Sequence, residues 1–128
     1  MKCGLTVAPL LMLSASAAIA ADMLPLTQGI YVVAGTPCEG ASNVDTLSYW
    51  GEYNGINDQR TRCRVTKLTR NGSTYSLRRS CTDIRAGFSF DDKAEITIRS
   101  RTSFLLHRGS RFASGDRTFR YCGPKVQL

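Results

Sequence analysis

The sequence predicts an all-β protein, a small antiparallel β-barrel or β-sandwich of about seven or eight short strands cross-linked by two disulfides. Short runs rich in β-branched and aromatic residues alternate with Gly, Pro, Asn and Asp along the chain. Little of the chain beyond its N-terminal segment looks helical. Four cysteines remain once that segment is set aside, which suits a small exported domain.

The first 20 residues have the pattern of a secretory signal peptide. Lys2 supplies a positive start, the stretch Leu5 to Ala18 carries no charge, and Ala18 and Ala20 form a small-residue cleavage site. The apolar run is shorter than the roughly 20 residues that cross a bilayer as a helix. We therefore expect cleavage after Ala20, no membrane span, and one β-rich domain over residues 21–128 in the periplasm or the medium.

The cysteines predict disulfides and no metal site. Cys3 leaves with the signal peptide, so an even number remains for an oxidising compartment. Zinc sites usually show closely spaced Cys or His pairs, whereas these cysteines are widely spaced and His107 is the only histidine. No metal and no cofactor are expected. The four remaining cysteines are Cys38, Cys63, Cys81 and Cys122.

The first strand is predicted over Gln28–Ala34, whose β-branched and aromatic run ends at Gly35 and Pro37. Ser42–Asp45 can form a short helical turn with Ser42 as its cap. The next strand is predicted over Leu47–Tyr53, which combines apolar and aromatic residues before the turn pair Asn54–Gly55.

A hairpin is predicted within Arg60–Cys81, where two alternating segments flank Asn71–Gly72. A two-residue loop there would set Cys63 opposite Ser80. A three-residue loop with a bulge at the glycine would instead set Cys63 opposite Cys81, close enough for a cross-strand disulfide.

That register favours a Cys63–Cys81 disulfide. The remaining pair, Cys38–Cys122, would tie the end of the first strand to the last strand, which favours a barrel over a sandwich. Four cysteines allow three pairings, so the two alternatives stay open.

Four further strands follow the hairpin by the same alternation. Asp91–Asp92, Arg101–Thr102 and Ser114–Gly115–Asp116 separate them as turns. The predicted strands are Ile84–Phe90, Ala94–Ser100, Ser103–Arg108 and Arg117–Cys122.

Charge is distributed unevenly along the expected mature chain. It has 16 Lys and Arg (17 less Lys2) against 10 acids, a net charge of +6. Residues 21–59 contain five acids and no Lys or Arg, and all 16 basic residues, 13 of them Arg, start at Arg60. An Arg-rich surface suits carboxylate or phosphate groups, so the expected partner is an anionic envelope component or an acidic protein cleft. The alternative is that these basic residues only keep the outward face of the strands solvated and bind no ligand.

One segment resembles a known family. Ser114–Gly115–Asp116–Arg117 is similar to the inhibitory loop of the bacterial periplasmic and membrane-bound inhibitors of c-type lysozyme, although Asp116 and Thr118 replace the motif's alanine and tyrosine. Those proteins are exported, disulfide-containing barrels whose loop enters the carboxylate-lined lysozyme cleft. The resemblance implies a binding role for Ser114 and Arg117. The nearby basic residues Arg108 and Arg111 are further candidates for the same site.

We expect a non-catalytic periplasmic binding protein. The chain contains no nucleophile elbow, phosphate loop or metal-binding histidine pair. Lysozyme inhibition is the first alternative. The second is a small secreted ribonuclease, in which Glu95 and His107 would act as base and acid, and Arg99 and Arg101 would hold phosphate. Nucleic acid is not an expected partner, because Tyr49, Trp50 and Tyr53, the residues suited to base stacking, fall in the acidic half.

Overall fold

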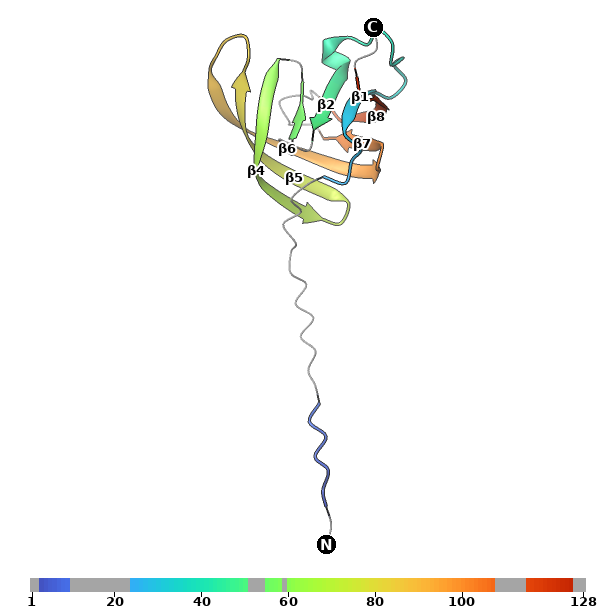
Figure 1. The fold of residues 1–128 in the computed structure, drawn as a ribbon, viewed down its shortest axis with the longest axis vertical. Helices are drawn as coiled ribbons and strands as arrows, with labels where there is room; N and C mark the ends of the chain where they lie inside the picture. The colour runs from blue at the N-terminus through green and yellow to red at the C-terminus, as the bar shows by residue number, and fades with distance from the viewer. Residues whose placement is uncertain (1–2, 10–23, 51–54, 59, 108–114, 126–128) are drawn as a thin grey trace.

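Eight antiparallel strands form one sheet in the order β3-β2-β1-β8-β7-β6-β5-β4, which curls into a nearly closed barrel (Figure 1). This computed structural model describes residues 3–9, 24–50, 55–58, 60–107 and 115–125. The strands are β1 (Gly29–Val33), β2 (Thr46–Trp50), β3 (Gly55–Asn57), β4 (Thr61–Asn71), β5 (Thr74–Asp83), β6 (Ser89–Ser100), β7 (Ser103–Leu106) and β8 (Arg117–Gly123).

The predicted all-β class, barrel and disulfide pairs are confirmed. Cys63 joins Cys81 across β4 and β5, and Cys38 joins Cys122 on β8. Two disulfides are compatible with an exported protein. Within the described ranges, no helix is long and apolar enough to cross a membrane. Residues 3–9, the described part of the expected signal peptide, form neither helix nor strand.

Most predicted strands lie where the sequence placed them, and the short turn after Ser42 is a 3-10 helix, η1 (Asn43–Asp45). The strand predicted over residues 84–90 and the turn predicted at Asp91–Asp92 are wrong. Residues 84–87 form the turn, and β6 runs through both aspartates. The reason is the preceding Asp83, whose carboxylate accepts hydrogen bonds from the backbone N–H groups of Arg85 and Ala86 and so starts the turn earlier.

The hairpin between β4 and β5 pairs the two cysteines by a different route from the one predicted. Its turn pairs Asn71 with Thr74, with Gly72 at a φ of 63°. Continued unchanged, this register would place Cys63 opposite Thr82. A bulge between Val65 and Lys67 shifts the pairing by one residue, so Cys63 faces Cys81. The bulge predicted at the glycine therefore lies six residues earlier, at Thr66.

Aromatic rings fill one part of the barrel interior. The ring of Phe104 lies between those of Tyr31 and Phe119, at centroid distances of 5.2 and 5.3 Å. Burial raises the pKa of Tyr31 to about 12, and its hydroxyl donates to the carbonyl of Thr27. These inward side chains alternate with outward polar ones, as the pleat of each strand requires.

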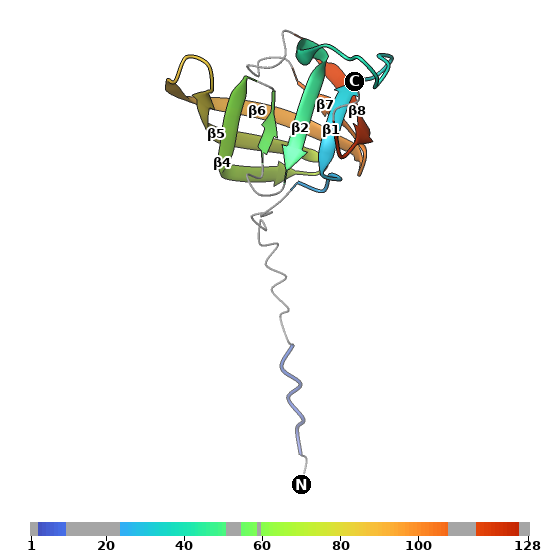
Figure 2. The same ribbon diagram turned by 45° about the horizontal axis from the view of Figure 1, so that its top comes forward.

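β3 and β4 lie side by side in Figure 2. Hydrogen bonds from or to side chains close the barrel there. Asn57 on β3 accepts a hydrogen bond at its Oδ1 from the backbone N–H of Cys63, at 2.6 Å. From inside the barrel, Nη1 of Arg79 donates to the carbonyl oxygen of Ile56 at 3.0 Å. Edge groups of β3 and β4 are thereby satisfied where the strands form no ladder.

Arg79 is the largest fully buried side chain of the described residues. Its guanidinium forms an ion pair with Asp92, the residue directly opposite on β6. Burial lowers the pKa of the Arg79 guanidinium, and the neighbouring Asp92 carboxylate opposes that shift. The charge is tolerated inside the barrel because it is paired and hydrogen-bonded.

Replacing Asp92 with Asn should destabilise the barrel strongly, because it leaves a buried guanidinium without its counter-charge. We expect Asp92→Asn to lower the free energy of unfolding by about 3–5 kcal/mol, measured by urea denaturation with the disulfides intact. Asp91→Asn changes an exposed carboxylate on the same strand and should stay within about 0.5 kcal/mol of wild type. Equal effects of the two substitutions would contradict the role of the ion pair.

Candidate anion-binding site

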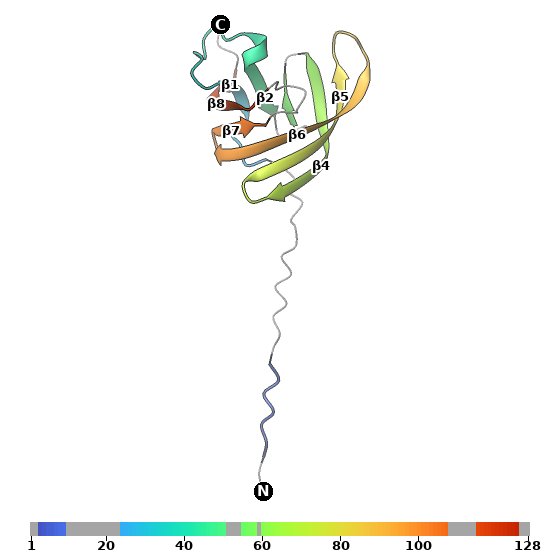
Figure 3. The same ribbon diagram turned by 180° about the vertical axis from the view of Figure 1, so that it is seen from behind.

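Three cationic side chains lie directly opposite one another on the outer face of β4, β5 and β6. Lys67 pairs with Arg78, and Arg78 pairs with Lys93. All three are exposed. Because neighbouring strands are about 4.8 Å apart, the row spans only about 10 Å at the backbone. We call these three residues the cationic row. Figure 3 shows the three strands curving together along one side of the barrel.

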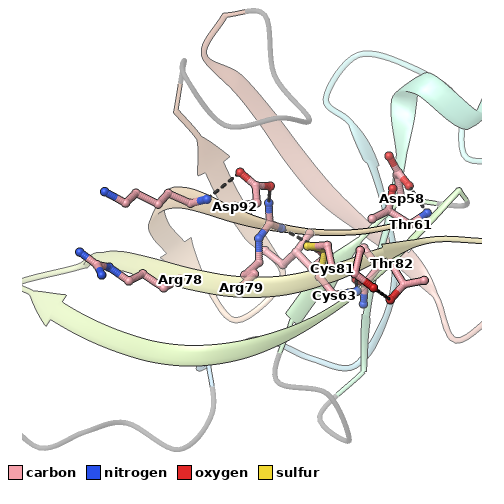
Figure 4. The surroundings of a disulfide bond; sticks show 12 residues. Asp58, Thr61, Cys63, Arg78, Arg79, Cys81, Thr82 and Asp92 are labelled. Atoms are coloured by element: carbon pink, nitrogen blue, oxygen red, sulfur yellow. Dashed lines mark hydrogen bonds and ion pairs between the residues drawn. A yellow bond between two sulfur atoms is a disulfide. The ribbon is translucent and has the colours of Figure 1, made fainter. Parts of the chain in front are cut away.

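Two members of the cationic row, Arg78 and Lys93, line a surface pocket of about 560 Å³. Figure 4 shows Arg78 and Arg79 leaving adjacent positions of β5 in different directions, with Arg79 turned toward Asp92. At the bulge, the Thr66 hydroxyl donates to the carbonyl of Arg78 at 3.2 Å and so lies at the pocket. The pocket is lined by Thr66, Arg78, Arg79, Asp91, Asp92 and Lys93.

The bulge at Thr66 determines the composition of this site. On one side of it Cys63 faces Cys81, and on the other Lys67 faces Arg78. Without the one-residue shift, the register that joins the cysteines would place Lys67 opposite Leu77, an inward residue. The disulfide and the cationic row therefore both depend on one irregular residue.

The chemistry of the pocket suits an anion. Among the described residues, none of the three cations of the row forms an ion pair with an acid. Arg78 offers a planar fork for a carboxylate, phosphate or sulfate group, and Lys93 offers a compact charge beside it. Asp91 lies on the same face, opposite Ser80. Its negative charge would repel a bound anion that extended toward Ser80. The described residues contain no cluster of His, Cys, Asp or Glu that could hold a metal.

The loop predicted from the lysozyme-inhibitor resemblance lies mostly outside the described residues, which exclude Arg108, Arg111 and Ser114. Arg117 is described and has internal partners. Its guanidinium forms an ion pair with Asp45 and donates to the carbonyl of Val44 at 2.9 Å. Arg117 thus anchors η1 to the start of β8, and its role in binding stays a prediction.

The residues considered for a ribonuclease lie on the outer face of β6 and β7. The backbone N–H of His107 donates to the carbonyl of Glu95 at 3.0 Å, so the two are neighbours. The His107 ring, however, has its Nε2 at 2.6 Å from the hydroxyl of Thr97. Arg99 and Arg101 are exposed near the β6–β7 turn. The structure gives no contact between the side chains of Glu95 and His107, so an acid–base pair remains a hypothesis.

Comparisons with protein-family models, with curated proteins and with solved structures find no match. Any functional interpretation therefore depends on the geometry of the chain itself. Among the described residues, the cationic row has the clearest chemistry. Sequence reasoning identified the basic half of the chain but not these three residues, because their alignment follows from the bulge. The available signal was the adjacent pair Arg78–Arg79, which in a strand must send one side chain inward.

The ion pair between Arg117 and Asp45 leads to a prediction about the pKa of the Asp45 carboxyl. The hydroxyl of Ser42 and the guanidinium of Arg117 lower the pKa of the Asp45 carboxyl. The stabilisation from Asp45 is therefore present above the usual aspartate range and is lost as the pH falls through the lowered pKa. In an NMR titration, Arg117→Gln should move the Asp45 midpoint upward, whereas Arg99→Gln should not. An unchanged midpoint in Arg117→Gln would contradict the ion pair.

Proposed function

We propose that this protein is a non-catalytic, exported binding protein whose cationic row holds the phosphate, carboxylate or sulfate groups of an anionic envelope component. The observation that carries the proposal is the direct opposition of Lys67, Arg78 and Lys93 across three strands. Solvation alone requires polar residues on this face, but it does not require like charges at opposite positions.

The cationic row is unfavourable for the fold. Like charges directly opposite on neighbouring strands destabilise a sheet, by up to about 1 kcal/mol for each pair. Asp91 and Glu95 flank Lys93 on the outer face of β6, but among the described residues no acid lies directly opposite any member of the row. A bound anion converts this repulsion into attraction, because its charge lies between the cations. An arrangement that is unfavourable for folding and favourable for ligand binding is typical of functional sites.

Replacing the central residue should have opposite effects on stability and on binding. Arg78→Gln removes both repulsive contacts, so the free energy of unfolding should stay equal or rise by about 0.2–1 kcal/mol. Retention on immobilised heparin, a probe polyanion, should weaken and elution should occur at lower salt.

The matched control is Arg99→Gln, which removes an exposed arginine of β6 outside the row. It should change heparin retention less than Arg78→Gln does. Equal losses in the two variants would show that only total charge matters, and absent or salt-insensitive retention of the wild-type protein would refute the proposed function.

Inhibition of c-type lysozyme is the second candidate. The observation that favours it is the anchored base of the resembling loop, since Arg117 is fixed by Asp45 and Val44 at the first residue of β8. A loop whose C-terminal end is fixed loses less entropy on binding. Ser114 would then contact the lysozyme cleft, as the resemblance implies.

Titration of the oxidised protein into a peptidoglycan lysis assay tests this candidate. Inhibition should saturate at a stoichiometric ratio, and Ser114→Ala should weaken it by about tenfold, the effect of losing one buried hydrogen bond of about 1.4 kcal/mol. Ser103→Ala, a serine of β7, is the matched control and should inhibit like wild type. Undiminished lysis at excess protein would remove this candidate.

A further inference from the structure

The turn between β5 and β6 projects beyond the barrel and carries two exposed apolar side chains. In Figures 1 and 3 it is the gold loop that stands clear of the other strands. Ile84 is 57% exposed and Phe88 is 47% exposed. The ring of Phe88 lies 5.7 Å from that of Phe90, the next inward residue of β6. We call Ile84 and Phe88 the apolar tip.

The backbone of this turn is held without help from the apolar tip. Oδ1 of Asp83 accepts hydrogen bonds from two N–H groups of the turn. The N–H of Asp83 donates to the carbonyl of Phe88, and the N–H of Ile84 donates to the carbonyl of Arg60, both at 2.9 Å. Gly87 supplies the positive φ of 72° that the turn needs. The hydrogen bonds that hold this turn therefore do not depend on the side chains of Ile84 and Phe88.

The charges around the apolar tip are mainly positive. Arg60, Arg62 and Arg85 are exposed beside it. The acid of the turn, Asp83, is 2% exposed and its carboxylate is 3.0 Å from the guanidinium of Arg60. Its pKa is lowered mainly by the hydrogen bond from Ala86 and also by Arg60, so it stays ionised and bound. Among the described residues, Asp58 is the other acid nearby, and its carboxylate accepts hydrogen bonds from the backbone N–H groups of Arg60 and Thr61. An approaching surface therefore meets apolar groups with more exposed cations than exposed acids near them.

We propose that the apolar tip inserts into the headgroup region of an anionic phospholipid bilayer, with Arg60, Arg62 and Arg85 at the level of the phosphates. Apolar side chains bordered by cations are the pattern of interfacial membrane binding. Two side chains on a convex loop offer far less area than the roughly 1,200–2,000 Å² that a stable protein–protein interface buries, whereas a bilayer needs no matching surface.

This surface is distinct from the cationic row and goes beyond the function proposed above. Arg78 lies five residues before Asp83 on β5, about 16 Å along the strand. That separation exceeds the Debye length of about 8 Å at physiological salt. With the apolar tip in the bilayer, the row would stand above the phosphate plane and contribute little to membrane attachment.

Cosedimentation with vesicles tests the proposal. The protein is purified from the oxidising compartment of the expression host and mixed with vesicles of phosphatidylglycerol and phosphatidylcholine, or of phosphatidylcholine alone. Wild-type protein should bind the anionic vesicles. The double variant Ile84→Ser with Phe88→Ser should bind on the order of tenfold more weakly, and Arg85→Gln about fivefold more weakly. The double variant Ile84→Leu with Phe88→Leu is the matched control and should retain binding.

A second measurement reports insertion directly. Trp50 is the only tryptophan of the chain, so Phe88→Trp in a Trp50→Phe background places the single fluorophore at the apolar tip. Its emission should shift to shorter wavelength with anionic vesicles and stay unchanged with neutral ones. The thermal unfolding of each variant, measured without vesicles, shows that the barrel is intact.

Three results would overturn the proposal: absent binding of wild-type protein to anionic vesicles, equal binding by the serine variant, or equal binding to neutral vesicles. Arg78→Gln separates this proposal from the function of the cationic row. It should weaken heparin retention and leave vesicle binding within about twofold, because the row lies beyond the screening distance. If heparin retention persists and vesicle binding is absent, only the membrane proposal fails.

Discussion

Arg79 extends from β5 into the barrel and joins it to two other strands. Its guanidinium forms an ion pair with Asp92 on β6 and donates a hydrogen bond to the carbonyl of Ile56 on β3. A buried cation is tolerable only when its counter-charge and hydrogen bonds are fixed, so this contact constrains all three strands at once. The hydrogen bond from Arg79 to Ile56 ties the short β3 to β5, and the hydrogen bond from Cys63 to Asn57 joins β3 to β4 where the barrel closes. The ion pair also requires Asp92 to face inward from a regular strand, which explains why β6 continues through two adjacent aspartates.

The same contact fixes what the outside of the sheet presents. Arg79 and Asp92 are direct cross-strand partners, so the residues next to them, Arg78 and Lys93, must also be partners and must face outward. The bulge at Thr66 completes this arrangement by bringing Lys67 opposite Arg78 while Cys63 stays opposite Cys81. The register that pairs Arg79 with Asp92 inside the barrel therefore also places Arg78 opposite Lys93 on its outer face.

The features that follow from local pattern were predictable from the sequence. Strand alternation, the Asn71–Gly72 turn signal and the cysteine count predict the class, the central hairpin and both disulfides. Features that follow from tertiary pairing were not. The turn propensity of Asp91–Asp92 is overridden by Arg79, and the position of the bulge depends on the disulfide as much as on the turn. β3 escaped prediction because three residues carry too little pattern. The cationic row could not be predicted either, because its alignment depends on the position of the bulge.

If the pairing of β5 with β6 slipped by one residue, every side chain of one of the two strands would move to the opposite face of the sheet. Arg79 would then lose its partner, Arg78 or Asp92 would turn to the wrong side, and a charge would be buried without compensation. The penalty for that slip is therefore electrostatic as well as hydrophobic. Because Asp83 and its turn lie four residues beyond Arg79 on the same strand, the register that keeps the cationic row outward also sets the direction in which Ile84 and Phe88 project. One buried ion pair, whose two residues also line the pocket beside the cationic row, thus maintains the register from which both exposed surfaces project.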